Sequence, residues 1–77
     1  MKVYAIDHND NKIEYDVIMT FKGSNDYVIY TNNSIDSKGN LKIYSAIYDP
    51  DTGLILRNPN TKEELEEIKK AFESSII

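Results

Sequence analysis

Residues 12–22 carry the pattern that most limits what this chain can fold into. Apolar side chains occupy every second position, and the positions between them are polar except for Ile18. This period of two is typical of a β-strand with one buried face. The apolar set comprises Ile13, Tyr15, Val17, Met19 and Phe21.

A second strand over residues 2–7 precedes this one, joined to it by a polar turn. We expect a two-residue loop centred on Asn9 and Asp10, because such residues tolerate left-handed backbone. That loop places Ile6 opposite Ile13 and Tyr4 opposite Tyr15, so both join the core face. Val3, Ala5 and Ile18 then fall on the other side of the sheet.

Further strands are expected over residues 26–31 and 41–48, with a short fifth strand possible over 54–56. The turn at 23–25, the polar loop at 32–40 with its turn at 38–40, and the turn at 49–53 separate them. Residues 41–48 are apolar on both sides, which is typical of a central strand. These elements predict an antiparallel meander of four to five strands.

Residues 62–75 predict one amphipathic helix. Thr61 and Glu64 fit a capping box, in which the two side chains bond to each other's backbone amides. An apolar stripe recurs at three- and four-residue spacing and includes Leu65, Ile68, Phe72 and Ile76. The fold class is therefore α+β, with a C-terminal helix packed on one face of the sheet.

Composition excludes several classes of protein. The chain has 77 residues, no cysteine and a net charge of −4. This length predicts a single domain over residues 1–77, and the lack of cysteine rules out disulfides and cysteine-bound metals. No apolar run is long enough to span a membrane, and Met1-Lys2 leads straight into a strand, so we expect neither a span nor a signal peptide.

No residue pattern predicts catalysis. His8 is the only histidine and lies in the turn at 7–11, where a solvated loop is the simpler interpretation. The same turn resembles the start of a calcium loop, but Lys12 and Ile18 stand where that loop needs Gly and Glu. We therefore expect no enzyme, no metal site and no cofactor; a small hydrolase or a metal-dependent enzyme is the weakest alternative.

Tyrosines on the sheet are the best candidates for a binding surface. A single helix covers one face, which leaves Tyr30, Tyr44 and Tyr48 as candidate partner-binding residues on the helix-free face. Tyrosine suits protein contact because it combines a large apolar area with a polar tip. Alternatives are stacking of single-stranded nucleic acid, which the acidic charge disfavours, and a partly wet sheet face with no partner.

The chain as a whole resembles a known family. Residues 14–21, 26–30, 44–50 and 60–68 are similar to the YrzB-like small acidic proteins of low-GC Gram-positive bacteria. That family has no established function, so the resemblance implies no catalytic or binding residue, only a cytoplasmic bacterial protein. The hypothesis at this point is a small cytosolic module for protein interaction, with an unknown protein partner or a second copy of itself.

Overall fold

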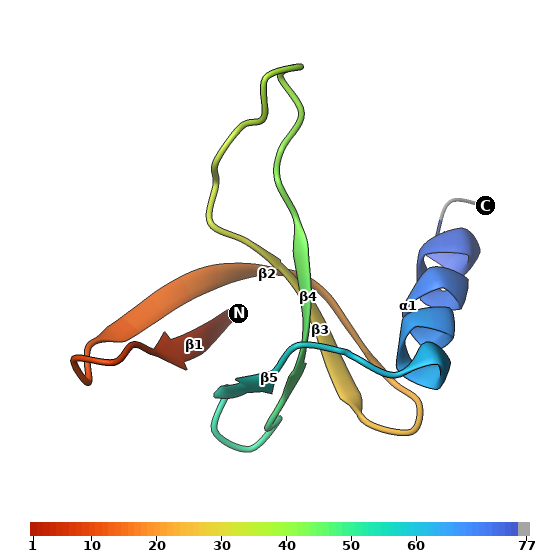
Figure 1. The fold of residues 1–77 in the computed structure, drawn as a ribbon, viewed down its shortest axis with the longest axis horizontal. Helices are drawn as coiled ribbons and strands as arrows, with labels where there is room; N and C mark the ends of the chain where they lie inside the picture. Colours follow the sequence, from red (N-terminus) through yellow and green to blue (C-terminus); the bar gives the residue numbers. More distant parts are fainter. Residues whose placement is uncertain (76–77) are drawn as a thin grey trace.

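The computed structural model describes residues 1–75 and places five strands before one helix (Figure 1). The strands form one antiparallel sheet in the order β1-β2-β3-β4-β5, which confirms the predicted meander. The helix packs on one face of this sheet, which confirms the α+β class. The elements are β1 (Lys2–Ile6), β2 (Lys12–Lys22), β3 (Asp26–Thr31), β4 (Tyr44–Tyr48), β5 (Ile55–Arg57) and α1 (Lys62–Ser75).

The β1–β2 turn differs by one residue from the predicted loop. Asp7 N–H donates to the Asn11 carbonyl, so three residues rather than two form the loop, with Asp10 in the left-handed region at φ 61°. The Asp7 carboxylate accepts the amides of Asn9 and Asn11 and fixes this geometry. Because a one-residue change of register exchanges the two faces of a strand, the predicted placement of β1 is wrong.

Val3 is therefore the core residue of β1. It pairs with Tyr15 and is fully buried, whereas Ile6 is 51% exposed. Tyr4 is half-buried, and the Lys12 ammonium lies 3.8 Å from the centre of its ring.

A bulge at Ile18 divides the apolar side of β2 between two cores. Val17 pairs with Tyr30, and Met19 pairs with the adjacent Ile29, which leaves Ile18 unpaired and exposed. Adjacent residues of β3 point to opposite faces, so Val17 and Met19 also lie on opposite faces. The alternating apolar side chains of β2 are consequently divided between two separate apolar clusters.

One cluster lies under the helix and the other lies inside the curve of the sheet. Ile68 and Phe72 of α1 pack on Tyr27, Ile29 and Ile47, with Met19 and Phe21 at the margin. The second cluster comprises Val3, Val28, Ala46 and Tyr48, flanked by Tyr15, Val17, Tyr30 and Ile55.

The sheet curls into a half-barrel and thereby covers the second cluster. Tyr4 N–H donates to the Gly53 carbonyl over 2.9 Å, and Tyr4 forms a parallel bridge with Leu54, next to β5. The first strand is thus brought against the last. The helix-free face is consequently an interior rather than an open surface.

The helix begins at the predicted cap. Glu64 N–H donates to the Thr61 hydroxyl over 3.1 Å, and Thr61 N–H donates to the Glu64 carboxylate over 3.2 Å. The apolar stripe is rotated from the predicted one, because buried Glu64 faces the sheet and Leu65 is 54% exposed. Ile76, the last residue of the predicted stripe, lies outside the described residues.

β4 is shorter than predicted and β5 lies one residue later. Regular pairing of β3 with β4 ends at Tyr30 and Tyr44, because Asn33 adopts a left-handed backbone at φ 65°. Beyond that kink, residues 32–43 form a projection that we call the arm, drawn in yellow-green and green in Figure 1. Leu54 lies in the bridge to β1, and the pairing of β4 with β5 starts at Ile55.

Candidate interaction surface

The three candidate tyrosines lie at different depths. Tyr48 is 6% exposed and belongs to the cluster inside the half-barrel. Tyr30 is half-buried, and Tyr44 is 40% exposed. Tyr44 and part of Tyr30 are therefore accessible to a partner. Tyr48 is a core residue, because the curled sheet covers the face on which it was expected to be accessible.

A row of three packed rings, tilted relative to one another, links the interior to the base of the arm. The ring centres of Tyr15 and Tyr30 are 4.9 Å apart, and those of Tyr30 and Tyr44 are 5.6 Å apart. These spacings are typical of favourable aromatic pairs. Burial raises the pKa of the Tyr30 hydroxyl above its ordinary value, with smaller contributions from its two neighbours. The row holds Tyr44 in place where β4 leaves the sheet.

The tip of the arm is a tight hairpin turn. The Asp36 carboxylate accepts the amides of Lys38 and Asn40, and Asp36 N–H donates to the Asn40 carbonyl over 2.8 Å. Gly39 takes the left-handed position at φ 82°. This turn repeats the geometry of the β1–β2 turn, in which Asp7, Asp10 and Asn11 hold the equivalent places.

The repetition is visible in the sequence, where 36–40 (Asp-Ser-Lys-Gly-Asn) matches 7–11 (Asp-His-Asn-Asp-Asn) in its first and last residues. The turn expected at residues 38–40 is confirmed, but the hairpin that it closes within the polar loop at 32–40 was not predicted from the sequence. The shared pattern of Asp at the first position and Asn at the last is the sequence signal that could have predicted it.

The base of the arm is anchored by side chains from β2 and β3. The buried Thr31 hydroxyl donates to the Lys42 carbonyl over 2.7 Å and accepts the Asn33 amide over 3.0 Å. The Asn33 side chain donates to the Asp16 carboxylate over 2.7 Å. This bond and the ion pair with Lys2 lower the pKa of Asp16. The left-handed kink at Asn33 is thus fixed on both sides.

Large apolar side chains of the arm are exposed. Ile35 and Leu41 form a cross-strand bridge behind the turn, and Ile43 follows Leu41 by two residues, the spacing that places side chains on one face of an extended chain. We call these three residues the apolar patch, and their exposed fractions are 58% for Ile35, 45% for Leu41 and 45% for Ile43. Tyr44, at the base of the arm, follows Ile43 by one residue and points to the opposite face, where it is 40% exposed.

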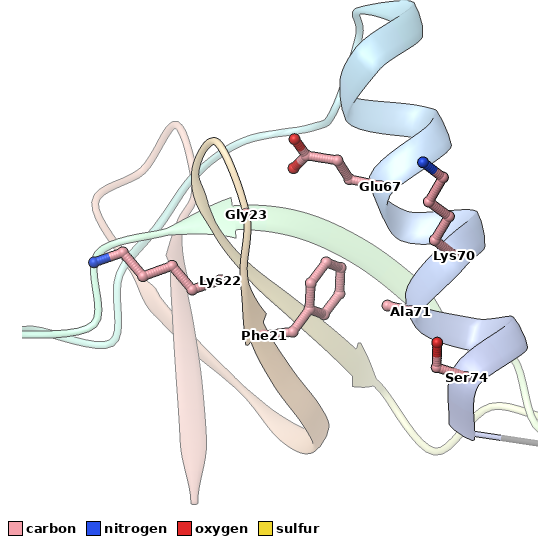
Figure 2. A pocket seen from close by; sticks show the side chains of 7 residues that line it. All are labelled: Phe21, Lys22, Gly23, Glu67, Lys70, Ala71 and Ser74. Carbon is pink, nitrogen blue, oxygen red and sulfur yellow. The ribbon is translucent and has the colours of Figure 1, made fainter.

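A small hollow lies elsewhere, between the β2–β3 turn and α1 (Figure 2). Its volume is about 270 Å³, and the Phe21 ring points from β2 toward the helix while the Lys22 side chain points away from it. The space is large enough for a small apolar group. The lining residues are Phe21, Lys22, Gly23, Glu67, Lys70, Ala71 and Ser74.

Glu67 ties the helix to the turn at one end of this hollow. Its carboxylate accepts the Ser24 amide over 3.0 Å and the Ser24 hydroxyl over 3.2 Å. Hydrogen bonds from the Tyr27 hydroxyl and from Ser24 lower its pKa. A Cβ atom at Gly23 would lie 2.2 Å from the carboxylate oxygen, so a larger residue here would displace the Glu67 carboxylate.

We expect Gly23→Ala to lower the Tm by roughly 4–8 °C, because the added methyl group displaces the Glu67 carboxylate from Ser24. Thermal unfolding followed by circular dichroism measures this loss. In a Glu67→Ala background the methyl group has nothing to displace, so the same substitution should cost little. An equal loss in both backgrounds would show that the steric explanation is wrong.

A second carboxylate, Glu64, connects three parts of the chain. It forms two hydrogen bonds with the Arg57 guanidinium, of 3.0 and 2.6 Å, and accepts the Asn25 amide group over 2.9 Å. The Arg57 bond, followed by the amides of Asn60 and Thr61, lowers the pKa of Glu64 to about 2. β5, the β2–β3 turn and the start of α1 therefore converge on one buried charge.

His8 and Asp7, which were considered as a catalytic residue and a calcium ligand, both lie in the β1–β2 turn. His8 is exposed at the β1–β2 turn, as expected. The Asp7 carboxylate, considered as a calcium ligand, accepts two backbone amides of that turn. Within residues 1–75 no three side chains of His, Cys, Asp or Glu lie close enough together to hold a metal ion.

The geometry thus defines a small α+β half-barrel with a projecting hairpin that carries an apolar patch. Residues 8–76 match a family described as "Protein of unknown function (DUF1292)", and the chain belongs to that family. This confirms the expected unknown-function family, whereas the narrower YrzB-like resemblance stays a prediction.

Neither the curated proteins nor the solved structures give a match. Over the described part of the chain, α1 is too short and too polar to cross a bilayer.

Proposed function

We propose that this protein is a non-enzymatic protein-interaction module and that its contact surface is the apolar patch on the arm. One observation carries the proposal. Three large apolar side chains, each at least 45% exposed, lie together on a hairpin that projects from the sheet. Clustered exposed apolar residues are a common mark of interaction sites, because their contact with water is unfavourable until a partner covers them.

The build of the arm supports this proposal. Its tip is held by the Asp36 carboxylate and its base by Thr31 and Asn33, so the patch is presented by ordered backbone. A preorganised surface loses little conformational entropy when it binds. The resemblance to YrzB-like proteins favours a cytoplasmic bacterial setting for such a module.

The alternative of nucleic-acid stacking has weaker support. Stacking of successive bases needs several accessible rings beside a basic groove. Tyr48 is buried, Tyr30 is half-buried, and the arm offers only Lys38 and Lys42 as bases in a chain of net charge −4. A protein partner makes better use of the apolar patch.

Affinity capture from a cell extract tests the proposal. We expect the double variant Leu41→Ser with Ile43→Ser to capture at least tenfold less of each partner protein than the wild-type chain does, because each lost apolar contact weakens binding. Ile6→Ser is the matched control, since Ile6 is 51% exposed but lies on β1. The proposal fails if the double variant captures the same proteins in the same amounts as the wild type.

A further inference from the structure

The outer edge of the β4 side of the arm has backbone groups without a strand partner. Lys42 N–H donates to the Ser34 carbonyl over 2.9 Å, and the Lys42 carbonyl accepts the Thr31 hydroxyl. The N–H and C=O groups of Lys42 therefore both point toward β3. The backbone N–H and C=O groups of successive residues point to alternate sides of an extended chain, so those of Leu41, Ile43 and Ser45 point away from β3.

The other end of β4 agrees with this assignment. Asp49 N–H donates to the Leu54 carbonyl on the β5 side. Because the direction alternates along the strand, the backbone groups of Ser45 and Ile43 also point to that side. Within residues 1–75, β5 pairs with β4 only at Ile47 and Tyr48. The edge at residues 41–45 is consequently open, and Figure 1 shows this part of the chain leading up into the projecting arm, away from α1 and β5.

We propose that this open edge pairs with the same edge of a second copy of the chain, which extends the proposed function by naming a partner. In an antiparallel pair centred on Ile43, Ile43 faces Ile43 of the second copy, and Leu41 faces Ser45. The outward amides and carbonyls of these residues then bond across a two-fold axis. Strand addition at an exposed edge is an established mode of association.

Side chains and charges of the segment fit a second copy. Ile35, Leu41 and Ile43 of both copies form one continuous apolar strip across the axis, which covers side chains that are 45–58% exposed in the single chain. On the other face, Lys42 of one copy lies opposite Tyr44 of the other, a favourable pairing of a cation with an aromatic ring. Residues 41–45 contain no carboxylate, so the acidic character of the chain is kept away from the contact.

Sedimentation velocity over a concentration series tests this pairing. Because the contact is small, we expect the wild-type chain to pass from monomer to dimer between about 10 μM and 1 mM. Ile43→Pro removes a backbone N–H donor that points to solvent in the single chain. Proline is tolerated at such a position, because the N–H of an edge strand that faces solvent has no strand partner to lose. The substitution should raise the dimer dissociation constant at least tenfold, whereas Ile6→Ser should leave it unchanged.

Ile43→Lys provides a second variant that keeps the amide and places two ammonium groups side by side at the axis. It should also weaken the dimer at least tenfold, and circular dichroism checks that both variants remain folded. The inference is overturned if the wild-type chain stays monomeric at 1 mM, or if both folded variants associate as the wild type does. If the wild-type chain is monomeric but the double variant at Leu41 and Ile43 still captures less protein from the extract, self-pairing is overturned and the proposed function stands.

Discussion

Tyr48→Ala is expected to lower the free energy of unfolding by about 3–5 kcal/mol, the range for removing a large aromatic side chain from a core. Tyr48 is 6% exposed and packs with Val3, Val28 and Ala46 inside the half-barrel. Domains of this size are only marginally stable, so the variant should be partly unfolded at room temperature. Urea denaturation followed by circular dichroism measures the change.

Tyr44→Ala is the matched control, because Tyr44 lies on the same strand but is 40% exposed. Its loss should cost about 1 kcal/mol or less, since mainly the ring contact with Tyr30 disappears. The pair of variants separates a core tyrosine from a surface tyrosine. Similar losses in the two variants would contradict the curled sheet, which is the feature that covers Tyr48.

Glu64→Gln should lower the Tm by roughly 10 °C. It removes the negative charge that faces Arg57 and weakens the bonds to Asn25, Asn60 and Thr61 together. Glu63→Gln is the control, because Glu63 lies in the same first turn but is exposed. Thermal melts at neutral pH compare the two, and equal shifts would argue against a special role for the buried carboxylate.

The same carboxylate predicts how stability depends on pH. The pKa of Glu64 is about 2 in the folded chain and 4.5 in its ordinary state, so the folded state favours the charged form. The stabilisation is complete above pH 4.5 and is lost as the pH falls toward 2, where the folded chain also takes up the proton. Urea midpoints from pH 6 to pH 2 should therefore fall more steeply for the wild type than for Glu64→Gln. Parallel curves would contradict this prediction.

Local signals in the sequence predicted the main elements. The alternation over residues 12–22 matches β2, and the capping box and apolar spacing match the observed α1. These features depend on residues close together in the chain, because backbone preferences and capping hydrogen bonds involve only near neighbours in the sequence. The strand order also follows from short connections, which place consecutive strands side by side.

The features that position the candidate surface depend on distant residues and could not be predicted in this way. The bulge at Ile18 interrupts no alternation in the sequence, because it is defined by how β2 pairs with β3. The curl of the sheet depends on the contact between Tyr4 and the segment at Gly53 and Leu54, nearly fifty residues later. Both features determine which tyrosines are covered, so Tyr30, Tyr44 and Tyr48 could not be ranked by exposure before the fold was known.

The rotation of α1 has a similar origin. Glu64 turns toward the sheet because Arg57 and Asn25 bind its carboxylate, and Leu65 is carried outward as a result. Sequence patterns alone favoured Leu65 as the buried residue because it is apolar. The ion pair between the buried Glu64 carboxylate and the half-exposed Arg57 side chain of β5 reverses that preference.

Photo-crosslinking at the arm tests the central claim most directly, namely that the apolar patch is the contact surface. A benzophenone amino acid is placed at position 43 in one variant and at position 6 in another, both exposed in the structure. Irradiation in cells should give a covalent adduct of defined mass from position 43, either with another protein or with a second copy, and none from position 6. No adduct from position 43, or the same adducts from both positions, would contradict the claim.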